Sequence, residues 1–216
     1  MINPIPINLV VEDSLSEAVV RKILLESGCS YSVGICYGQG GSGYLKKKIC
    51  GFNNAAKGTP FFVLTDLDKS ECPPALLEEW LPKPRHPNLL FRIAVREVES
   101  WLLADQKAIS KFLGIQRESV PINVDAEDNP KQLLINLTRK SKNRLLREAI
   151  VPSLCSTANV GPDYNSYLIS FVRDHWNIKE AMRRSSSLQH TVNAVRCFKP
   201  NVMDDIVPFD MVKERR

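Results

Sequence analysis

The chain has 216 residues, of which 44% are hydrophobic and 25% are charged, and its formal net charge at neutral pH is +5. This composition excludes a disordered chain, and no apolar run reaches the ~20 residues needed to span a bilayer. The N-terminus has neither a basic leader nor a small-residue cleavage site. We therefore expect a cytoplasmic protein with no signal peptide and no membrane partner. Its six cysteines are scattered without a CxxC pair, which favours free thiols over disulfides or a zinc site.

Charge is distributed unevenly along the chain. Residues 1–130 carry 14 basic and 16 acidic side chains, a net charge of −2, whereas residues 131–216 carry 15 basic and 8 acidic side chains, a net charge of +7. An acidic first part suits metal ions, and a basic second part suits a polyanion bound alongside. A mildly basic solvated surface is the simpler reading of the same totals.

Short apolar runs rich in β-branched residues predict four buried strands in the first half of the chain. They cover residues 5–11, 31–37, 60–65 and 89–95. Helical spacing follows each run, and the expected helices begin at Ser14, after the glycine-rich stretch 38–43, at Pro73 and near Arg96. Ser14 and Glu17 have the spacing of a capping box, in which Ser14 is the helix N-cap.

Strands that alternate with helices indicate βαβ units, so we expect an α/β fold with a mainly parallel sheet covered by helices on both faces. The fourth helix is expected to run to about Leu113. The remainder is polar over residues 116–130, then basic and amphipathic over 131–149, with further helices within 164–184 and 188–197. We therefore divide the chain into a metal-binding domain over 1–113 and a basic, mostly helical C-terminal region over 114–216 packed on it.

Carboxylates follow three of the four predicted strands. These residues are Glu12 and Asp13, Asp66 and Asp68, and Glu97 and Glu99. Ligands of open parallel sheets bind beyond the carboxyl ends of the strands, and clustered carboxylates repel one another unless cations lie between them. Mg²⁺ prefers such oxygen ligands, and in an extended segment Asp66 and Asp68 would point the same way and share one ion. The alternative is that each acid is a helix cap or a first-turn charge.

The first and third strand ends together resemble a TOPRIM domain, the Mg²⁺-binding fold of topoisomerases, primases and OLD-type nucleases. The segment VVEDSLSEAVVRKIL is similar to the first block of a TOPRIM-like group of small prokaryotic proteins, some of which are encoded beside ATPases in apparent phage-defence loci. VLTDLDKSECPPALL and AVREVESWLLAD resemble the second and third blocks of that group. The resemblance covers about residues 6–113, continues less strongly through Asn129-Pro130-Lys131 and the serine-rich stretch, and implies a three-layer TOPRIM-like fold. Asp13 stands where the group usually has glycine, which bears on how closely a phosphate approaches that turn.

The resemblance implies a role for each matching residue. Glu12 would be a metal ligand or the general base, and Asp66 with Asp68 would hold Mg²⁺ or Mn²⁺. Glu99, with or without Glu97, would bind a second metal. Lys131 would stabilise the charged transition state, although a surface lysine at a helix N-terminus is an equal alternative.

Basic residues in two places predict contacts to nucleic-acid phosphates. The first group follows the glycine-rich stretch, and the second lies in the basic helix: Lys46, Lys47, Lys48, and Arg139, Lys140, Lys142, Arg144. Solvated helix faces would give the same pattern. The glycine-rich stretch 38–43 also matches the GxGxxG pattern of dinucleotide-binding folds. This pattern normally follows the first strand of the sheet, whereas here it follows the second. A site for NAD would also give the carboxylates at the strand ends no role.

The function expected from these features is Mg²⁺-dependent hydrolysis of phosphodiester bonds in DNA or RNA by a two-metal carboxylate mechanism. The resemblance adds a role as the effector of an ATPase-regulated defence system, with an ATPase partner. The sequence is compatible with a homo-oligomer. The alternative is a non-catalytic module: a receiver-like phosphoacceptor, in which Asp66 takes the phosphoryl group, or a TOPRIM-like scaffold that binds a partner.

Overall fold

The computed structural model describes residues 3–38 and 40–201. Four strands form one all-parallel sheet in the order β2-β1-β3-β4. Their bounds are Ile5–Val11 for β1, Tyr31–Gly38 for β2, Phe61–Asp66 for β3 and Leu89–Ala94 for β4. The prediction of a parallel α/β fold followed by a helical region is confirmed.

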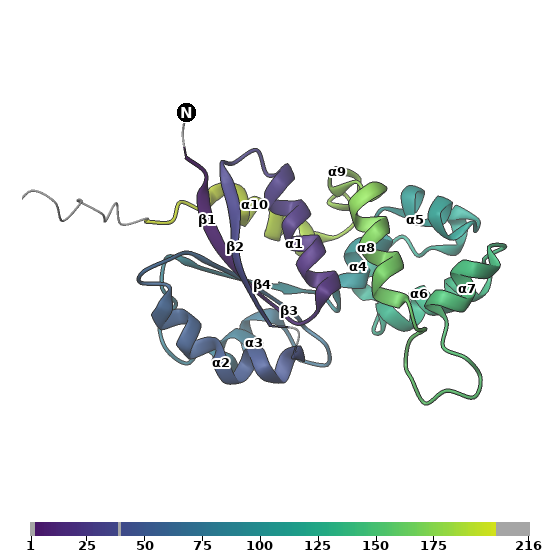
Figure 1. Cartoon of the computed structure of the whole chain (residues 1–216), viewed down its shortest axis with the longest axis horizontal. Helices are drawn as coiled ribbons and strands as arrows, with labels where there is room; N and C mark the ends of the chain where they lie inside the picture. Colours follow the sequence, from purple (N-terminus) through teal and green to yellow (C-terminus); the bar gives the residue numbers. More distant parts are fainter. Residues whose placement is uncertain (1–2, 39, 202–216) are drawn as a thin grey trace, which may run out of the picture.

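Helices cover both faces of this sheet (Figure 1). Helices α1 (Ser14–Glu26) and α10 (Ser186–Cys197) lie on one face, and α2 (Gly41–Ala55) and α3 (Pro73–Trp80) lie on the other. Alternate residues of β3 feed two separate apolar clusters, Phe62 and Leu64 on the α1 side and Phe61 and Val63 on the α2 side. Burial on both faces explains why each strand is a continuous apolar run in the sequence.

The strand order changes direction beside β1. The chain passes from β1 to β2 on one side, then crosses to β3 and β4 on the other. The carboxyl ends of β1 and β3 therefore border a topological switch point, where open α/β sheets leave a crevice for ligands. Glu12 follows β1 directly, and Asp66 is the last residue of β3.

Strand β2, at one edge of the sheet, contains a bulge. Ile7 pairs with Val33, but Leu9 pairs with Cys36, so β2 has one extra residue there. The side chain of Asn8 fills the gap, because its Oδ1 atom accepts a hydrogen bond from the backbone N–H of Ile35 at 2.8 Å.

The helical region packs on the α1 side of the sheet (Figure 1). Helices α4 (Val98–Ala104) and α5 (Gln106–Leu113) follow β4 and lead into this region. Beyond residue 113 its elements are η1 (Arg117–Ser119), η2 (Val124–Ala126), α6 (Pro130–Arg139), α7 (Arg144–Ile150), α8 (Tyr164–Asp174) and α9 (Ile178–Ala181). Buried side chains of α4, α6, α8 and α10 join those of β1 and β3 in one apolar cluster. No helix among the described residues is long and apolar enough to cross a membrane.

Side-chain caps correct three of the predicted boundaries. The N-cap of α1 is Asp13, whose Oδ1 atom accepts from the N–H of Ser16 at 2.8 Å, and Ser14 is already helical. The helix predicted from 96 to 113 breaks at Asp105, which caps α5. The helix predicted over 131–149 is two helices, because Asn143 caps α7 after a short turn.

Candidate functional site

Glu12 lies at the switch point, directly after β1 and beside the end of β3. Its Oε1 atom accepts hydrogen bonds from the Thr65 hydroxyl and from the backbone N–H of Asp66, the latter at 2.9 Å. Burial raises the pKa of Glu12, the two hydrogen bonds oppose that shift, and the charges of Asp68 and Asp13 add to it. The N–H of Gly41 donates to the carbonyl of Glu12 at 3.2 Å, so α2 begins beside this acid.

Asp66 joins β3 to the start of α4. Its Oδ1 atom accepts from the N–H of Val98, the first residue of α4, at 2.9 Å. Burial, followed by the charges of Glu99 and Glu12, raises the pKa of Asp66 well above the ordinary aspartate value. Three acids from three different strand ends therefore share one neighbourhood and repel one another there.

Glu99, in the first turn of α4, is 2% exposed. Its Oε1 atom accepts a hydrogen bond from the Tyr164 hydroxyl at 2.8 Å and lies 3.6 Å from the Nζ atom of Lys131. Burial raises the pKa of Glu99, and the positive charge of Lys131 opposes this. Tyr164 is also buried, at 3% exposure, so this contact is shielded from solvent.

Lys131 lies between the two acids of the third block. Its backbone N–H donates to Glu97 Oε2 at 2.8 Å, and its Nζ atom is 3.9 Å from Glu97 Oε1. Burial by itself would lower the pKa of Lys131, but the negative charges of Glu99, Glu97 and Asp66 raise it. A permanently charged ammonium therefore sits where the resemblance implies a second metal.

Asp68 adopts a different geometry from the one expected. Strand β3 ends at Asp66, and Asp68 has a left-handed backbone conformation with φ of 50° and an exposed side chain. The extended arrangement that would point both aspartates at one ion is not the one the chain adopts. Asp68 instead lines a cavity of about 550 Å³ that opens beside the site, together with Lys69, Ser70, Glu97, Asp128 and Asn129.

The donor set matches a hard cation in its chemistry. Among the described residues, no three His, Cys, Asp or Glu side chains are arranged as a ready metal-ligand set. Mg²⁺, however, usually keeps several waters and uses only one or two protein carboxylates together with substrate phosphates. Glu12 and Asp66 meet that smaller requirement, since they are all-oxygen donors held side by side with raised pKa values.

The two groups of predicted phosphate-binding residues lie on different layers of the molecule (Figure 1). Lys46, Lys47 and Lys48 are exposed on α2, and the Nζ atom of Lys46 pairs with Glu79 at 2.5 Å. The others lie at the end of α6 and the start of α7, where Arg139, Lys140 and Lys142 are exposed and Arg144 pairs with Glu148 at 2.7 Å. Only the second group shares an element with the site, because α6 also carries Lys131.

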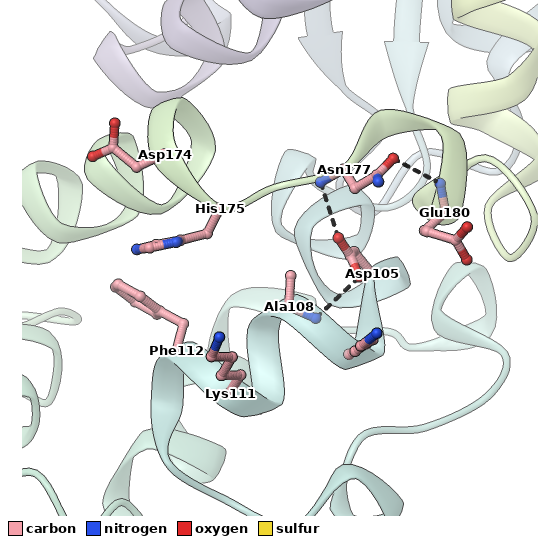
Figure 2. A pocket seen from close by; sticks show the side chains of 9 residues that line it. Asp105, Ala108, Lys111, Phe112, Asp174, His175, Asn177 and Glu180 are labelled. Atoms are coloured by element: carbon pink, nitrogen blue, oxygen red, sulfur yellow. Dashed lines mark hydrogen bonds between the residues drawn. The ribbon is translucent and has the colours of Figure 1, made fainter.

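A separate cavity of about 710 Å³ lies between α5 and the α8–α9 turn (Figure 2). None of the site acids lines it. Asp105 has a structural role there, because its carboxylate accepts hydrogen bonds from the backbone N–H groups of Ala108 at 3.0 Å and Asn177 at 2.9 Å. His175 faces Phe112 across the opening, with ring centroids 5.9 Å apart. We assign no function to this cavity.

No protein-family model, curated protein or solved structure matches the chain.

Two residues of the site were not among those that the sequence singled out for function. Thr65 lies inside an apolar strand, where a threonine is ordinary. Tyr164 begins the predicted helical stretch 164–184, where a tyrosine is interpreted as a packing residue. Neither has a local signal that would mark it, because each acquires its role through a contact with an acid more than 50 positions away.

Proposed function

We propose that the protein is a TOPRIM-like, Mg²⁺-dependent phosphodiester hydrolase that acts on DNA or RNA. The observation that carries this proposal is the meeting of Glu12, Asp66 and Glu99 at the switch point of the sheet, each with a raised pKa. Evolution rarely retains several mutually repelling buried carboxylates for stability, because their desolvation is costly. Perturbed acids gathered in a crevice are typical of functional sites.

Each residue has a distinct task in this proposal. Glu12 and Asp66, with Glu99 completing the carboxylate set, would hold the ion, which when bound would supply an activated water and charge stabilisation for the phosphate. Glu12, whose hydrogen bonds fix its carboxylate against Thr65 and Asp66, is also suited to accept a proton from that water. Lys131 offers a positive charge to the phosphoryl oxygens as negative charge develops on them.

The contacts of Lys131 favour one ion over two. The two-metal mechanism needs a second ion at Glu97 and Glu99, where the Lys131 ammonium lies within 4 Å of both carboxylates. Counting Mn²⁺ ions per chain by equilibrium titration discriminates the mechanisms. One ion in the wild type would assign the second charge to Lys131, and two ions would require that Lys131 turns away.

The substrate would be a polyanion that reaches the site along α6. Arg139 lies about 12 Å along this helix from Lys131, a distance of a few nucleotides, and Lys140 and Lys142 follow beyond the end of the helix. Binding should weaken steeply with salt, since each lysine or arginine contact releases a counterion. The role as effector of an ATPase-regulated defence system, and assembly into a homo-oligomer, remain part of the proposal on the strength of the resemblance.

The test is cleavage of plasmid, linear DNA and tRNA by the purified chain with Mg²⁺ or Mn²⁺. We expect cleavage that EDTA abolishes and that falls at least 100-fold in Asp66→Asn, which keeps the hydrogen bond to Val98 through its amide oxygen. Asp174→Asn is the matched control, because Asp174 is exposed at the end of α8 and lines the separate cavity, which none of the site acids lines. Metal-independent cleavage, or an unchanged rate in Asp66→Asn, would contradict the proposal.

A receiver-like module is the second candidate, because the strand order 2-1-3-4 is that of the first four strands of the flavodoxin-like receiver fold. Asp66 would then be the phosphoacceptor. Glu99 and Glu97 weigh against this candidate, since their charges repel a phosphoryl group. Incubation with acetyl phosphate and Mg²⁺, followed by mass spectrometry of Asp66, tests it directly. Absence of both cleavage and phosphorylation would leave the scaffold as the remaining candidate.

A further inference from the structure

Tyr164 is the one phenol that reaches the acid cluster from the helical region, among the residues that the structure describes. It is the first residue of α8, it is 3% exposed, and its hydroxyl donates to Glu99 Oε1 at 2.8 Å. Burial, followed by the charge of Glu99, raises the pKa of Tyr164 well above the ordinary tyrosine value. Because this hydroxyl is shielded from solvent and already donates to a carboxylate, its role is that of a hydrogen-bond donor.

The backbone that precedes α8 fixes where this hydroxyl lies. The N–H of Gly161 donates to the carbonyl of Ile150 at 2.9 Å, and the N–H of Asp163 donates to the carbonyl of Ala149 at 3.0 Å. A β-carbon at Gly161 would lie 2.3 Å from the Ala149 carbonyl oxygen, so the chain can approach the end of α7 this closely only with glycine. Helix α8 then packs along α1, whose first turn borders the site (Figure 1).

The chemistry of the pair sets the direction of the effect. A carboxylate that accepts a hydrogen bond is favoured in its ionised form, and its rotamer is held by the donor. Lys131 approaches the same Oε1 atom at 3.6 Å, so the two donors anchor one oxygen of Glu99. The other oxygen is thereby fixed in orientation. Partners that orient a ligand in this way typically change metal affinity or activity 10–100-fold when they are lost.

We propose that Tyr164 is a positioning residue, which holds the carboxylate of Glu99 in its working orientation at the acid cluster. The inference rests on the proposed function, because it assigns the contact to a site that binds a divalent cation. It also extends that function, because it makes the helical region responsible for the geometry of an acid that the sheet region carries.

The experiment measures Mn²⁺ binding to the full chain by electron paramagnetic resonance, alongside cleavage. We expect Tyr164→Phe, which keeps the ring and removes only the hydroxyl, to bind Mn²⁺ about 10–100-fold more weakly. Tyr167→Phe is the matched control, since Tyr167 lies one turn further along α8 and is only partly buried. Circular dichroism of both variants checks that the fold is retained.

A double-mutant cycle separates positioning from a purely structural role. If the hydroxyl acts through Glu99, Tyr164→Phe should have little further effect on Mn²⁺ affinity in a Glu99→Gln background. Equal and additive losses in both backgrounds would overturn the inference, as would a wild-type affinity in Tyr164→Phe, and either result leaves the proposed function standing. A wild-type chain that binds no Mn²⁺ and cleaves nothing would instead overturn the proposed function, and the inference with it.

Discussion

The sheet edge and the helical region contribute opposite charges to the same site. Four acids come from residues 1–113: Glu12 and Asp66 lie at the ends of β1 and β3, and Glu97 and Glu99 lie at the start of α4. The helical region beyond residue 113 brings the donors that face them, the ammonium and backbone N–H of Lys131 and the hydroxyl of Tyr164. The sheet therefore concentrates negative charge, and the packed helices partly offset it.

Because the donors come from the helical region, that region is part of the candidate site. Buried carboxylates without partners destabilise a fold by several kcal/mol. The apolar cluster that unites β1 and β3 with α6, α8 and α10 is what brings the donors to the acids. Any treatment of residues 1–113 as a self-sufficient metal-binding unit would leave Glu99 without either of its donors.

The largest expected loss of stability tests how firmly the helical region is held, and it is expected at Asp105, which anchors that region. Asp105→Ala removes the acceptor of two backbone N–H groups, those of Ala108 and Asn177. We expect the free energy of unfolding to fall by about 2–3 kcal/mol, measured by urea denaturation. Asp174→Ala, at an exposed residue of the same cavity (Figure 2), should leave stability unchanged. Equal stabilities of the two variants would mean that these caps do not hold the region together.

A smaller loss of stability is expected at Lys131, where the two regions meet. Lys131→Met removes the cation between Glu97 and Glu99 and keeps most of the side-chain volume. We expect a loss of about 1–2 kcal/mol at pH 7.5, less than for a fully buried pair because the lysine side chain is 35% exposed. Denaturation in EDTA and then in Mg²⁺ measures it. Mg²⁺ should restore more stability to Lys131→Met than to the wild type if an ion then occupies the Glu97–Glu99 position.

The smallest expected effect is a gain in stability that depends on pH, and it concerns Asp66. Because the pKa of Asp66 is raised above its unfolded value of 3.8, the folded chain binds this proton more tightly than the unfolded chain does. Stability must therefore fall as pH rises from about 4 through the raised pKa. Asp66→Asn has no such proton, so above that window it should be more stable than the wild type by on the order of 1 kcal/mol, or about 2–4 °C in Tm.

Thermal unfolding of Asp66→Asn and wild type from pH 5 to pH 8 in EDTA measures this difference. Glu12 and Glu99 have pKa shifts in the same direction, so part of the decline should persist in the variant. Parallel pH profiles for the two proteins would show that Asp66 is not under electrostatic strain. Saturating Mg²⁺ should raise the wild-type Tm and narrow the gap between the two proteins.

The sequence predicts the strands well because each is buried on both faces. A continuous apolar run bounded by polar residues has few alternative readings, and the predicted strands 5–11 and 89–95 match β1 and β4 to within one residue. The helix breaks at Asp105 and before Asn143 were not predictable from apolar spacing, which continues through both. They arise because polar side chains there accept backbone hydrogen bonds, one of them from a residue 72 positions away.

The candidate site likewise contains residues that the sequence marks locally and residues whose role depends on tertiary contacts. The acids could be found because position at a strand end is a local property of the sequence, and so could Lys131, through its place in the resemblance. Their partners could not be found. Thr65 and Tyr164 acquire their contacts only through tertiary packing, and the left-handed backbone of Asp68 depends on hydrogen bonds with Arg96.

The bulge in β2 has a consequence for the behaviour of the protein at high concentration. Edge strands invite sheets of other molecules to pair with them, and most proteins discourage this with lysine or proline. The eight residues of β2 contain neither, nor any acidic residue. The extra residue held by Asn8 breaks the regular spacing of amide groups that a foreign strand would have to match. Asn8→Val removes the acceptor that holds this bulge, so we expect the variant to form fibres more readily than the wild type.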